Sequence, residues 1–140
     1  MIVMLDPVFF DSNVFLYAYS SDPADRKKSV RARELLSGFL PCLSSQVLQE
    51  FIAASLRKTQ LGITEEKIDI FLELTRDFPF QPLTRDLICQ ATRLRRRFSF
   101  SHWDSTIIAA AHTSGCGKLY SEDLQDGFTL DQLTIFNPFV

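Results

Sequence analysis

Few residues of this 140-residue chain are suited to binding a soft metal ion or to forming disulfide bonds. The three cysteines, Cys42, Cys89 and Cys116, are odd in number and widely spaced, with no Cys-x-x-Cys pair. This pattern argues against both a disulfide framework and a zinc knuckle. The two histidines, His102 and His112, are too few for a histidine-rich zinc site, and we expect both to be structural.

Long apolar runs and a large excess of one charge are also missing. No apolar run approaches the roughly 18–20 residues that span a bilayer, and the opening residues 1–5 have no basic flank of the kind found in signal peptides. We therefore expect a cytoplasmic protein without a membrane partner. The formal net charge is −2, so the chain as a whole does not attract a polyanion, and a role with nucleic acid needs local clusters of basic residues.

The composition is that of an ordinary globular protein. Hydrophobic residues make up 46% of the chain and charged residues 23%, which disfavours intrinsic disorder. The length corresponds to about one domain, and the sequence has no internal repeat and no Gly/Ser linker. We therefore expect residues 1–140 to form a single domain.

Short apolar segments alternate with longer segments that carry helix-capping residues and helical spacing. The strand candidates, of which the third is restricted by two prolines, are Pro7–Phe10, Pro41–Ser44, Phe78–Leu83, Lys118–Ser121 and Leu133–Phe136. The expected helices begin at Val14, near Asp25, at Ser44 or Ser45 (spanning about Ser45–Arg57, with Gly62 as the break), and after the capping residues Thr64, Thr84 and Ser101. This alternation predicts an α/β fold in which helices flank a central, mainly parallel sheet of four to five short strands.

Four carboxylates lie where such a fold brings residues together, because ligands of parallel sheets bind beyond the carboxyl ends of the strands. Asp11 and Asp123 each follow a strand candidate, whereas Glu50 and Asp104 lie near the starts of two expected helices. Each carboxylate also has an ordinary structural explanation. Asp11 fits a helix cap, and Asp104 fits a capping box with Ser101. Asp123 fits a turn, and Glu50 fits a solvated helix face.

The helical spacing favours a shared site over these separate explanations. Asp104 lies on the same helical row as the apolar Ile107, and Glu50 borders the row of Phe51. No lysine or arginine lies close in the sequence to Asp11, Glu50 or Asp104. Two carboxylates 4 Å apart repel by about 4 kcal/mol at an effective dielectric constant of about 20. Several of them together require a hard divalent cation, for which oxygen ligands select magnesium or manganese, and this chemistry suits phosphodiester hydrolysis.

Four segments around these carboxylates resemble the four acidic motifs of PIN-domain ribonucleases, in the order that the family has them. The segments are VFFDSNVF (residues 8–15), SQVLQEF (45–51), WDS (103–105) and YSEDLQDG (120–127). One departure is Ser12, where the family often has threonine, although both residues can cap a helix. Being short, with no sign of an appended module, the chain is most similar to the VapC-type toxins of type II toxin–antitoxin systems.

The resemblance implies a metal-dependent endoribonuclease that hydrolyses RNA phosphodiester bonds. The implied catalytic carboxylates are Asp11, Glu50, Asp104 and Asp123. Of these, Asp11, Asp104 and Asp123 would contact Mg²⁺ or Mn²⁺ (Asp123 directly or through water), while Glu50 would hold a second ion or orient the attacking water. The implied supporting residues are Asn13, Ser121 and Asp126. The resemblance further implies an RNA substrate, a cognate antitoxin protein and a homodimer.

The densest basic run, at Arg93, Arg95, Arg96 and Arg97, ends one of the expected helices. A solvated helix end, favoured by the helix dipole, explains the run most simply. Contact with RNA phosphates is the alternative, and it would position RNA without reading its sequence. Trp103 can likewise stack on a base, although a position at the edge of the core is the simpler expectation.

Two other classes of function are compatible with an α/β fold but fit this sequence less well. One is an aspartate-phosphorylated enzyme or receiver domain on a similar sheet, which is disfavoured because Asp11-Ser12-Asn13 lacks the Asp-x-Asp pair expected of a haloacid-dehalogenase-like phosphatase. A non-catalytic PIN-like module that binds RNA or protein would gain nothing from four converging carboxylates beside a polyanion. RNA cleavage with and without EDTA discriminates these alternatives.

Overall fold

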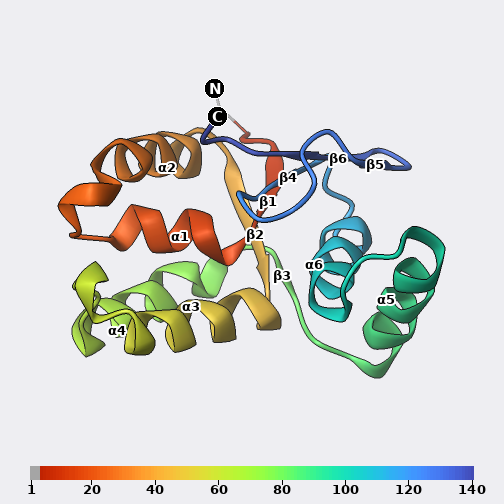
Figure 1. Cartoon of the computed structure of the whole chain (residues 1–140), viewed down its shortest axis with the longest axis horizontal. Coiled ribbons are helices and arrows are strands. Elements are labelled where there is room, and N and C mark those ends of the chain that lie inside the picture. The colour runs from red at the N-terminus through yellow and green to blue at the C-terminus, as the bar shows by residue number, and fades with distance from the viewer. Residues whose placement is uncertain (1–3) are drawn as a thin grey trace.

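In a computed structural model, which describes residues 4–140, the chain forms one six-stranded sheet with helices on both sides (Figure 1). The strands are β1 (Pro7–Phe10), β2 (Leu40–Ser44), β3 (Phe80–Gln81), β4 (Lys118–Tyr120), β5 (Thr129–Leu130) and β6 (Leu133–Phe136). They lie in the order β3-β2-β1-β4-β6-β5, and every neighbouring pair is parallel except β5 with β6. The predicted α/β fold with a mainly parallel sheet is therefore confirmed.

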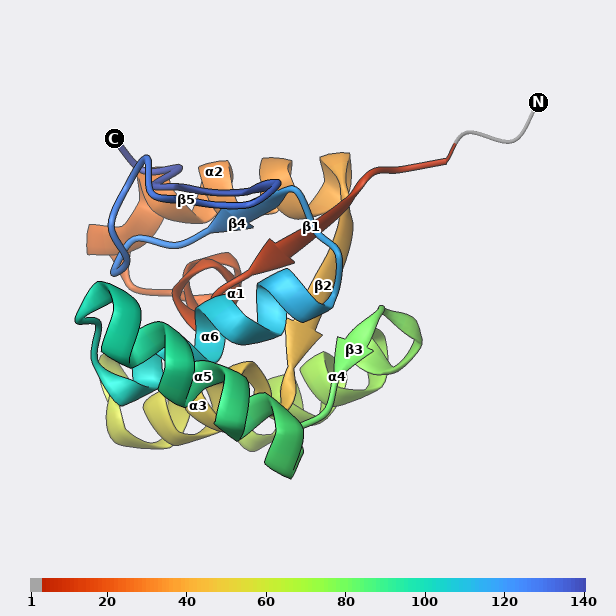
Figure 2. The same ribbon diagram turned by 90° about the vertical axis from the view of Figure 1, so that its right-hand side faces the viewer.

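Six α-helices cover this sheet. They are α1 (Ser12–Tyr19), α2 (Arg26–Gly38), α3 (Ser45–Arg57), α4 (Glu65–Leu74), α5 (Arg85–Phe98) and α6 (His102–Thr113). Helices α1 to α4 lie on one side of the sheet and α5 and α6 on the other, where Figure 2 shows them in front. Over the described range 4–140, none of the helices has the length and apolar character needed to cross a bilayer.

Four predicted helix starts are confirmed by their hydrogen bonds. The side-chain oxygens of Ser44, Thr64, Thr84 and Ser101 each accept the backbone N–H three residues further on. Such a bond satisfies one of the donors that an α-helix leaves free at its first turn. These caps set where α3, α4, α5 and α6 begin, and hence where Glu50 and Asp104 lie.

The end of α3 agrees with the prediction, whereas the start of α1 and the number of strands differ from it. α1 begins at Ser12, two residues before the expected Val14, because Asp11 caps it. α3 ends at Arg57, where Lys58 leaves the helical conformation, and a separate 3₁₀ turn, Thr59–Leu61, precedes Gly62. This turn returns Leu61 to the core, where its carbonyl accepts the N–H of Ser21 at 2.7 Å. The sheet has six strands, more than the four to five expected, because β5 adds a hairpin to β6, and a strand of two residues is too short to produce a period-2 pattern.

Phenylalanine rings fill much of the core and fix the strand that carries the site. Phe9 and Phe10 of β1 are fully buried, as are Phe51 and Phe71, whose rings stack with their centroids 3.8 Å apart. Truncating such a ring to alanine costs about 3–5 kcal/mol of folding free energy. Because β1 is held in this core, the residue that follows it, Asp11, emerges at a fixed point on the carboxyl edge of the sheet.

Candidate active site

Asp11 lies where β1 ends and α1 begins, beside the end of β4. Its backbone N–H donates to the carbonyl of Tyr120 at 3.0 Å, and the residue is only 5% exposed. Its Oδ1 accepts the N–H of Ser12 at 2.7 Å, and its Oδ2 accepts the hydroxyl of Ser121 at 2.7 Å. Asp11 is therefore a helix cap, as expected, but one whose second oxygen is bound by the segment that follows β4.

Burial raises the pKa of Asp11 from 3.8 to about 6. The hydrogen bonds from Ser121 and from the Ser12 N–H lower this pKa, because they stabilise the charged form, whereas the negative charges of Glu50 and Asp123 raise it. Both carboxylates thus lie near enough to Asp11 to repel it. Among residues 4–140, none of the three forms an ion pair with a basic side chain. Such a cluster favours a cation from outside the chain.

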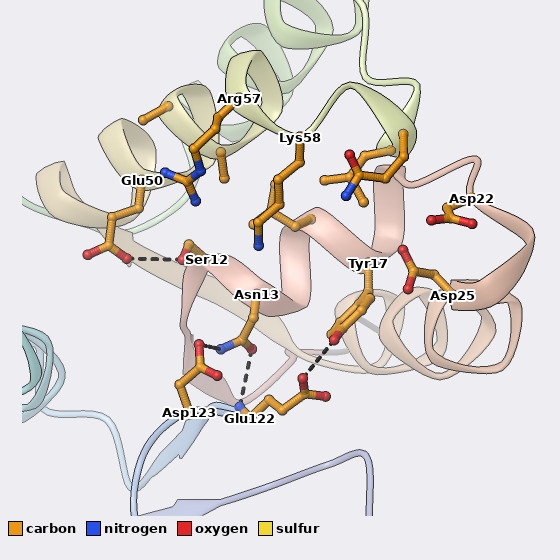
Figure 3. A pocket seen from close by; sticks show the side chains of 15 residues that line it. Ser12, Asn13, Tyr17, Asp22, Asp25, Glu50, Arg57, Lys58, Glu122 and Asp123 are labelled. Atoms are coloured by element: carbon orange, nitrogen blue, oxygen red, sulfur yellow. Dashed lines mark hydrogen bonds between the residues drawn. The ribbon is translucent and has the colours of Figure 1, made fainter.

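Asn13 and Ser121 tie the start of α1 to the loop after β4. The Asn13 amide donates to Asp123 Oδ2 at 3.2 Å and to Ser121 Oγ at 3.3 Å, and its oxygen accepts the N–H of Glu122 at 3.2 Å. Ser121 Oγ also accepts the N–H of Asp123 at 3.2 Å. Figure 3 shows Asn13 between Asp123 and Glu122. These bonds hold the exposed carboxylate of Asp123 beside the buried one of Asp11.

Glu50 joins this network from α3. Its Oε2 accepts the hydroxyl of Ser12 at 3.0 Å, and its Oε1 accepts the amide of Gln46 at 2.7 Å. The same Gln46 amide donates to the backbone carbonyl of Trp103 at 3.1 Å. Gln46 therefore connects Glu50 to the first turn of α6, the turn that carries Asp104.

The Asp104 carboxylate is partly exposed and has no hydrogen bond or ion pair with the rest of the described chain. Its backbone N–H donates to the Ser101 hydroxyl at 3.0 Å, which is half of the expected capping box, but the Ser101 N–H does not donate to its carboxylate. The capping-box explanation thus accounts for Ser101 and leaves the Asp104 side chain without a structural partner.

The candidate metal ligands are carboxylate oxygens, and oxygen ligands suit a hard divalent cation. Two polar side-chain atoms near these carboxylates are buried without a hydrogen-bond partner in the described structure. They are Gln46 Oε1, one helical turn before Glu50, and Ser105 Oγ, in the residue after Asp104. In residues 4–140, however, no three or more His, Cys, Asp or Glu side chains are already gathered around one metal position. The residues therefore fit a cation in chemistry and charge. Asp104 is free to turn toward one, and Asp123 can do so by giving up its 3.2 Å bond from Asn13.

Glu122 differs from the neighbouring carboxylates because its charge is already compensated. Lys28 Nζ lies 2.7 Å from Glu122 Oε2, and the Tyr17 hydroxyl donates to Oε1 at 2.6 Å. The same lysine stacks on the Tyr17 ring with its Nζ 4.9 Å from the centroid. Sequence reasoning did not single out Glu122, and its local role is to attach the loop after β4 to α1 and α2.

An open cleft of about 480 Å³ runs over α1 between the end of α3 and the loop after β4. Glu50, Ser12, Asn13 and Asp123 line it, and so do two basic residues that the sequence analysis did not select, Arg57 and Lys58 (Figure 3). Arg57 follows Glu50 by seven residues, two turns along the same helical face, which is a signal that the sequence did contain.

A second groove, of about 500 Å³, adjoins the cleft at Glu50. Trp103, His102, Leu83 and Ile88 line it. Trp103 is 66% exposed, so its expected position at the edge of the core is wrong. Its ring and that of the neighbouring His102 are arranged edge to face, with a centroid distance of 4.9 Å.

Asp126 and the basic run lie apart from the carboxylate network. Asp126 Oδ1 accepts the N–H of Asn137 at 2.9 Å, which ties the loop after β4 to the segment after β6. The arginines at the end of α5 are exposed, and two of them, Arg93 and Arg97, line a third groove that shares no lining residue with the acidic cleft. The structure thus gathers Asp11, Glu50, Asp123, Asn13 and Ser121, and it leaves these other predicted residues outside that cluster.

Three solved structures share this architecture. A toxin–antitoxin complex from Klebsiella pneumoniae aligns with a TM-score of 0.68 at 14% identity, over 94% of this chain and 97% of its own. The sarcin–ricin loop-cleaving toxin VapC20 of Mycobacterium tuberculosis aligns with a TM-score of 0.65 at 19% identity, over 80% and 86%. VapBC2 of Rickettsia felis, bound to a promoter DNA fragment, aligns with a TM-score of 0.64 at 16% identity, over 92% and 96%. At these identities the similarity establishes a common fold.

The sequence itself matches a known family. No curated protein matches the chain. A family model described as the PIN domain, by contrast, matches residues 8–126, a span that contains all four carboxylates and their hydrogen-bond partners. The chain belongs to the PIN domain family.

Proposed function

We propose that this PIN domain is a metal-dependent endoribonuclease that hydrolyses RNA phosphodiester bonds. The observation that carries the proposal is the cluster of Asp11, Glu50 and Asp123, in which burial and mutual repulsion raise the pKa of Asp11 and no basic side chain of the described residues pairs with any of the three. Such a cluster is costly in an apoprotein and is compensated when a cation binds. Membership of the PIN family supports the same activity.

Asp11, Asp104 and Asp123 would hold the cation, which we propose to be Mg²⁺ or Mn²⁺ because every available ligand atom is oxygen. When bound, such an ion supplies positive charge against the charge that develops on the phosphodiester, and it lowers the pKa of a nucleophilic water. Asp11 contributes a carboxylate that is fixed in position by Ser12 and Ser121. Asp104 and Asp123 contribute carboxylates that can reorient.

Glu50 and the polar residues around it would organise the reactants. Glu50 is held from both sides by Ser12 and Gln46, so one of its oxygens is well placed to accept a hydrogen bond from an attacking water or to contact a second ion. Asn13 and Ser121 position Asp123 and Asp11 without contacting the reacting atoms. Asp126 would support the site indirectly, by fixing the loop that carries Asp123.

We further propose that the protein acts in the cytoplasm as the toxin of a toxin–antitoxin pair, as a homodimer that a cognate antitoxin binds. The support is that structures of the same fold include a toxin–antitoxin complex and a VapBC2 assembly. Co-expression with the product of the neighbouring reading frame, followed by affinity purification and light scattering, tests the partner and the oligomeric state. Growth arrest that the neighbouring product relieves is the expected result.

Cleavage of RNA by the purified protein, with Mg²⁺, with Mn²⁺ and with excess EDTA, tests the proposed activity. We expect cleavage with either ion and none with EDTA. The matched control is Asp11→Asn, prepared in the same way, which excludes a contaminating nuclease. Equal cleavage by the wild type and Asp11→Asn would overturn the proposal, and RNA binding without cleavage by the wild type would favour a non-catalytic module.

A further inference from the structure

The end of α3 brings two cations to the acidic cleft. α3 runs from Ser45 to Arg57, so Arg57 is its last residue, and Lys58 follows where the backbone leaves the helix. At a rise of about 1.5 Å per residue, Arg57 lies about 10 Å along the helix axis from Glu50 and on the same face. Figure 3 shows the side chains of Arg57 and Lys58 extending from α3 toward Ser12 and Asn13. The end of α3 thus places two adjacent basic side chains beside the carboxylates of the cleft.

Neither cation is engaged by the protein. Arg57 and Lys58 are the basic residues that line the cleft, and five carboxylates line it with them. Even so, neither makes an ion pair or a side-chain hydrogen bond within residues 4–140. Lys28 behaves differently, since it is bound to Glu122. Basic groups that stay unpaired beside carboxylates are available for an anionic ligand in the same cleft.

An RNA strand that reaches the carboxylates must bring its negative backbone into a cleft lined by acids. We propose that Arg57 and Lys58 bind the backbone phosphates next to the cleaved bond and so hold the RNA over the carboxylates. This inference rests on the proposed ribonuclease activity. The guanidinium of Arg57 can grip one phosphate with two parallel hydrogen bonds, and the ammonium of Lys58 acts as a point charge on the next. Phosphate contacts position the strand without reading its sequence.

The experiment measures RNA binding in a protein that cannot cleave. Asp11→Asn provides the background, since asparagine caps helices as well as aspartate does. Fluorescence anisotropy with a labelled, random-sequence, single-stranded 15-nucleotide RNA gives the affinity between 25 and 200 mM KCl. We expect Arg57→Gln/Lys58→Gln to reduce the slope of log affinity against log salt by about 1.4, since each lost phosphate contact on a single strand removes about 0.7. The affinity at low salt should fall about 10-fold per cation.

Two controls distinguish a local contact from a general charge effect. Arg76→Gln removes a charge outside the cleft, where Arg76 faces Glu73 at 3.7 Å, and should leave the slope unchanged. Arg95→Gln/Arg96→Gln removes two charges at the end of α5 and should reduce the slope less than the cleft variant does. In the cleaving protein, Arg57→Lys/Lys58→Arg should keep KM low, whereas the glutamine pair should raise KM far more than it lowers kcat, as expected for positioning residues.

The inference is overturned if the glutamine pair leaves the salt slope unchanged, if the α5 pair reduces it equally, or if the Asp11→Asn protein does not bind the RNA. Failure of the proposed function has a separate signature, because it is the absence of metal-dependent cleavage by the protein with Asp11 intact. A wild type that cleaves RNA, with an unchanged KM in the glutamine pair, would therefore reject the phosphate contact and retain the ribonuclease.

Discussion

The two halves of the site are built in different ways. The strand half, with Asp11, Asn13, Ser121 and Asp123, lies at the ends of β1 and β4 and is joined by a continuous set of hydrogen bonds. In the helix half, with Glu50 and Asp104, the Gln46 side chain bonds both Glu50 of α3 and the Trp103 carbonyl of α6, while the Asp104 carboxylate has no such bond within residues 4–140.

This difference separates the contributions of the two halves to stability and to activity. In the strand half, the groups proposed to hold the cation also cap a helix and fix a loop, so substitutions there affect both folding and catalysis. In the helix half, the Asp104 carboxylate makes no hydrogen bond or ion pair with residues 4–140, although its backbone N–H belongs to the Ser101 cap. Substitutions that change activity without changing stability, or the reverse, therefore test this difference between the two halves.

The largest effect is expected at Asp11. Asp11→Asn should lower RNA cleavage by about 10³-fold, because it removes a charged ligand. It should nevertheless be at least as stable as the wild type at pH 7.5, since it keeps the cap and removes a buried charge. Asp11→Ala should lose the same activity and in addition about 1–2 kcal/mol of stability, because α1 loses its cap. Calorimetric melting and a cleavage assay measure both. Equal stability of the two variants would show that Asp11 has no role in folding.

Asp104→Asn should lower cleavage by about 10²-fold with no change in stability beyond about 0.5 kcal/mol. The physical reason is that the Asp104 carboxylate has no partner in the described chain, so its loss should affect only the binding of the proposed cation. Thermal melting with and without Mg²⁺ provides the measurement: the wild type should be stabilised more by the ion than the variant. A marked loss of stability in the ion-free variant would contradict the contrast between the two halves.

Ser121→Ala should reduce cleavage by about 10-fold and cost about 1–3 kcal/mol of stability, because the buried hydroxyl serves Asp11, Asn13 and the Asp123 N–H together. The hydrogen bond from Ser121 lowers the pKa of Asp11. Its removal should therefore move the acidic limb of the pH–rate profile to higher pH. A lower rate with an unshifted profile would mean that Ser121 acts on the loop alone.

The last expected effect is on stability and not on the rate of cleavage, and it is measured against pH in EDTA. The folded-state pKa of Asp11 is about 6 and its ordinary value is 3.8, so between these pH values the folded protein binds more protons than the unfolded chain. Stability from this group is therefore present at low pH and decreases as pH rises from 3.8 to 6, by at most about 3 kcal/mol. Asp11→Asn should thus be more stable than the wild type at pH 7.5, and the difference should shrink at pH 5. A difference that stays constant with pH would contradict the raised pKa.

The strand half is also the part of the site that could be predicted from the sequence. Asp11 and Asp123 each follow a short apolar strand, and the rule for parallel sheets brings such positions together at one edge. Capping residues such as Ser44 and Ser101 fixed where α3 and α6 begin, and hence roughly where Glu50 and Asp104 lie. These signals depend on residues that are neighbours in the chain, so they can be recognised in the sequence without a structure.

What the sequence did not reveal depends on contacts between elements. The start of α1 at Ser12 depends on the hydrogen bonds that hold Asp11 as its cap. Trp103 is exposed although the residues that follow it in α6, from Ser105 to Ala111, are buried. The basic run at the end of α5 is conspicuous in the sequence. Arg57 is marked there only by its spacing of two helical turns from Glu50, and the position of Arg57 and Lys58 in the acidic cleft depends on the placement of α3 over α1.

Titration calorimetry with Mn²⁺ at pH 7.5 tests the central claim most directly, namely that the carboxylates on the edge of the sheet form a binding site for a divalent cation. The account predicts saturable binding to the wild type, and binding at least about 10-fold weaker for Asp11→Asn and for Asp104→Asn, each of them fully folded by circular dichroism. Identical binding curves for the wild type and both variants, or no binding to the wild type, would contradict it.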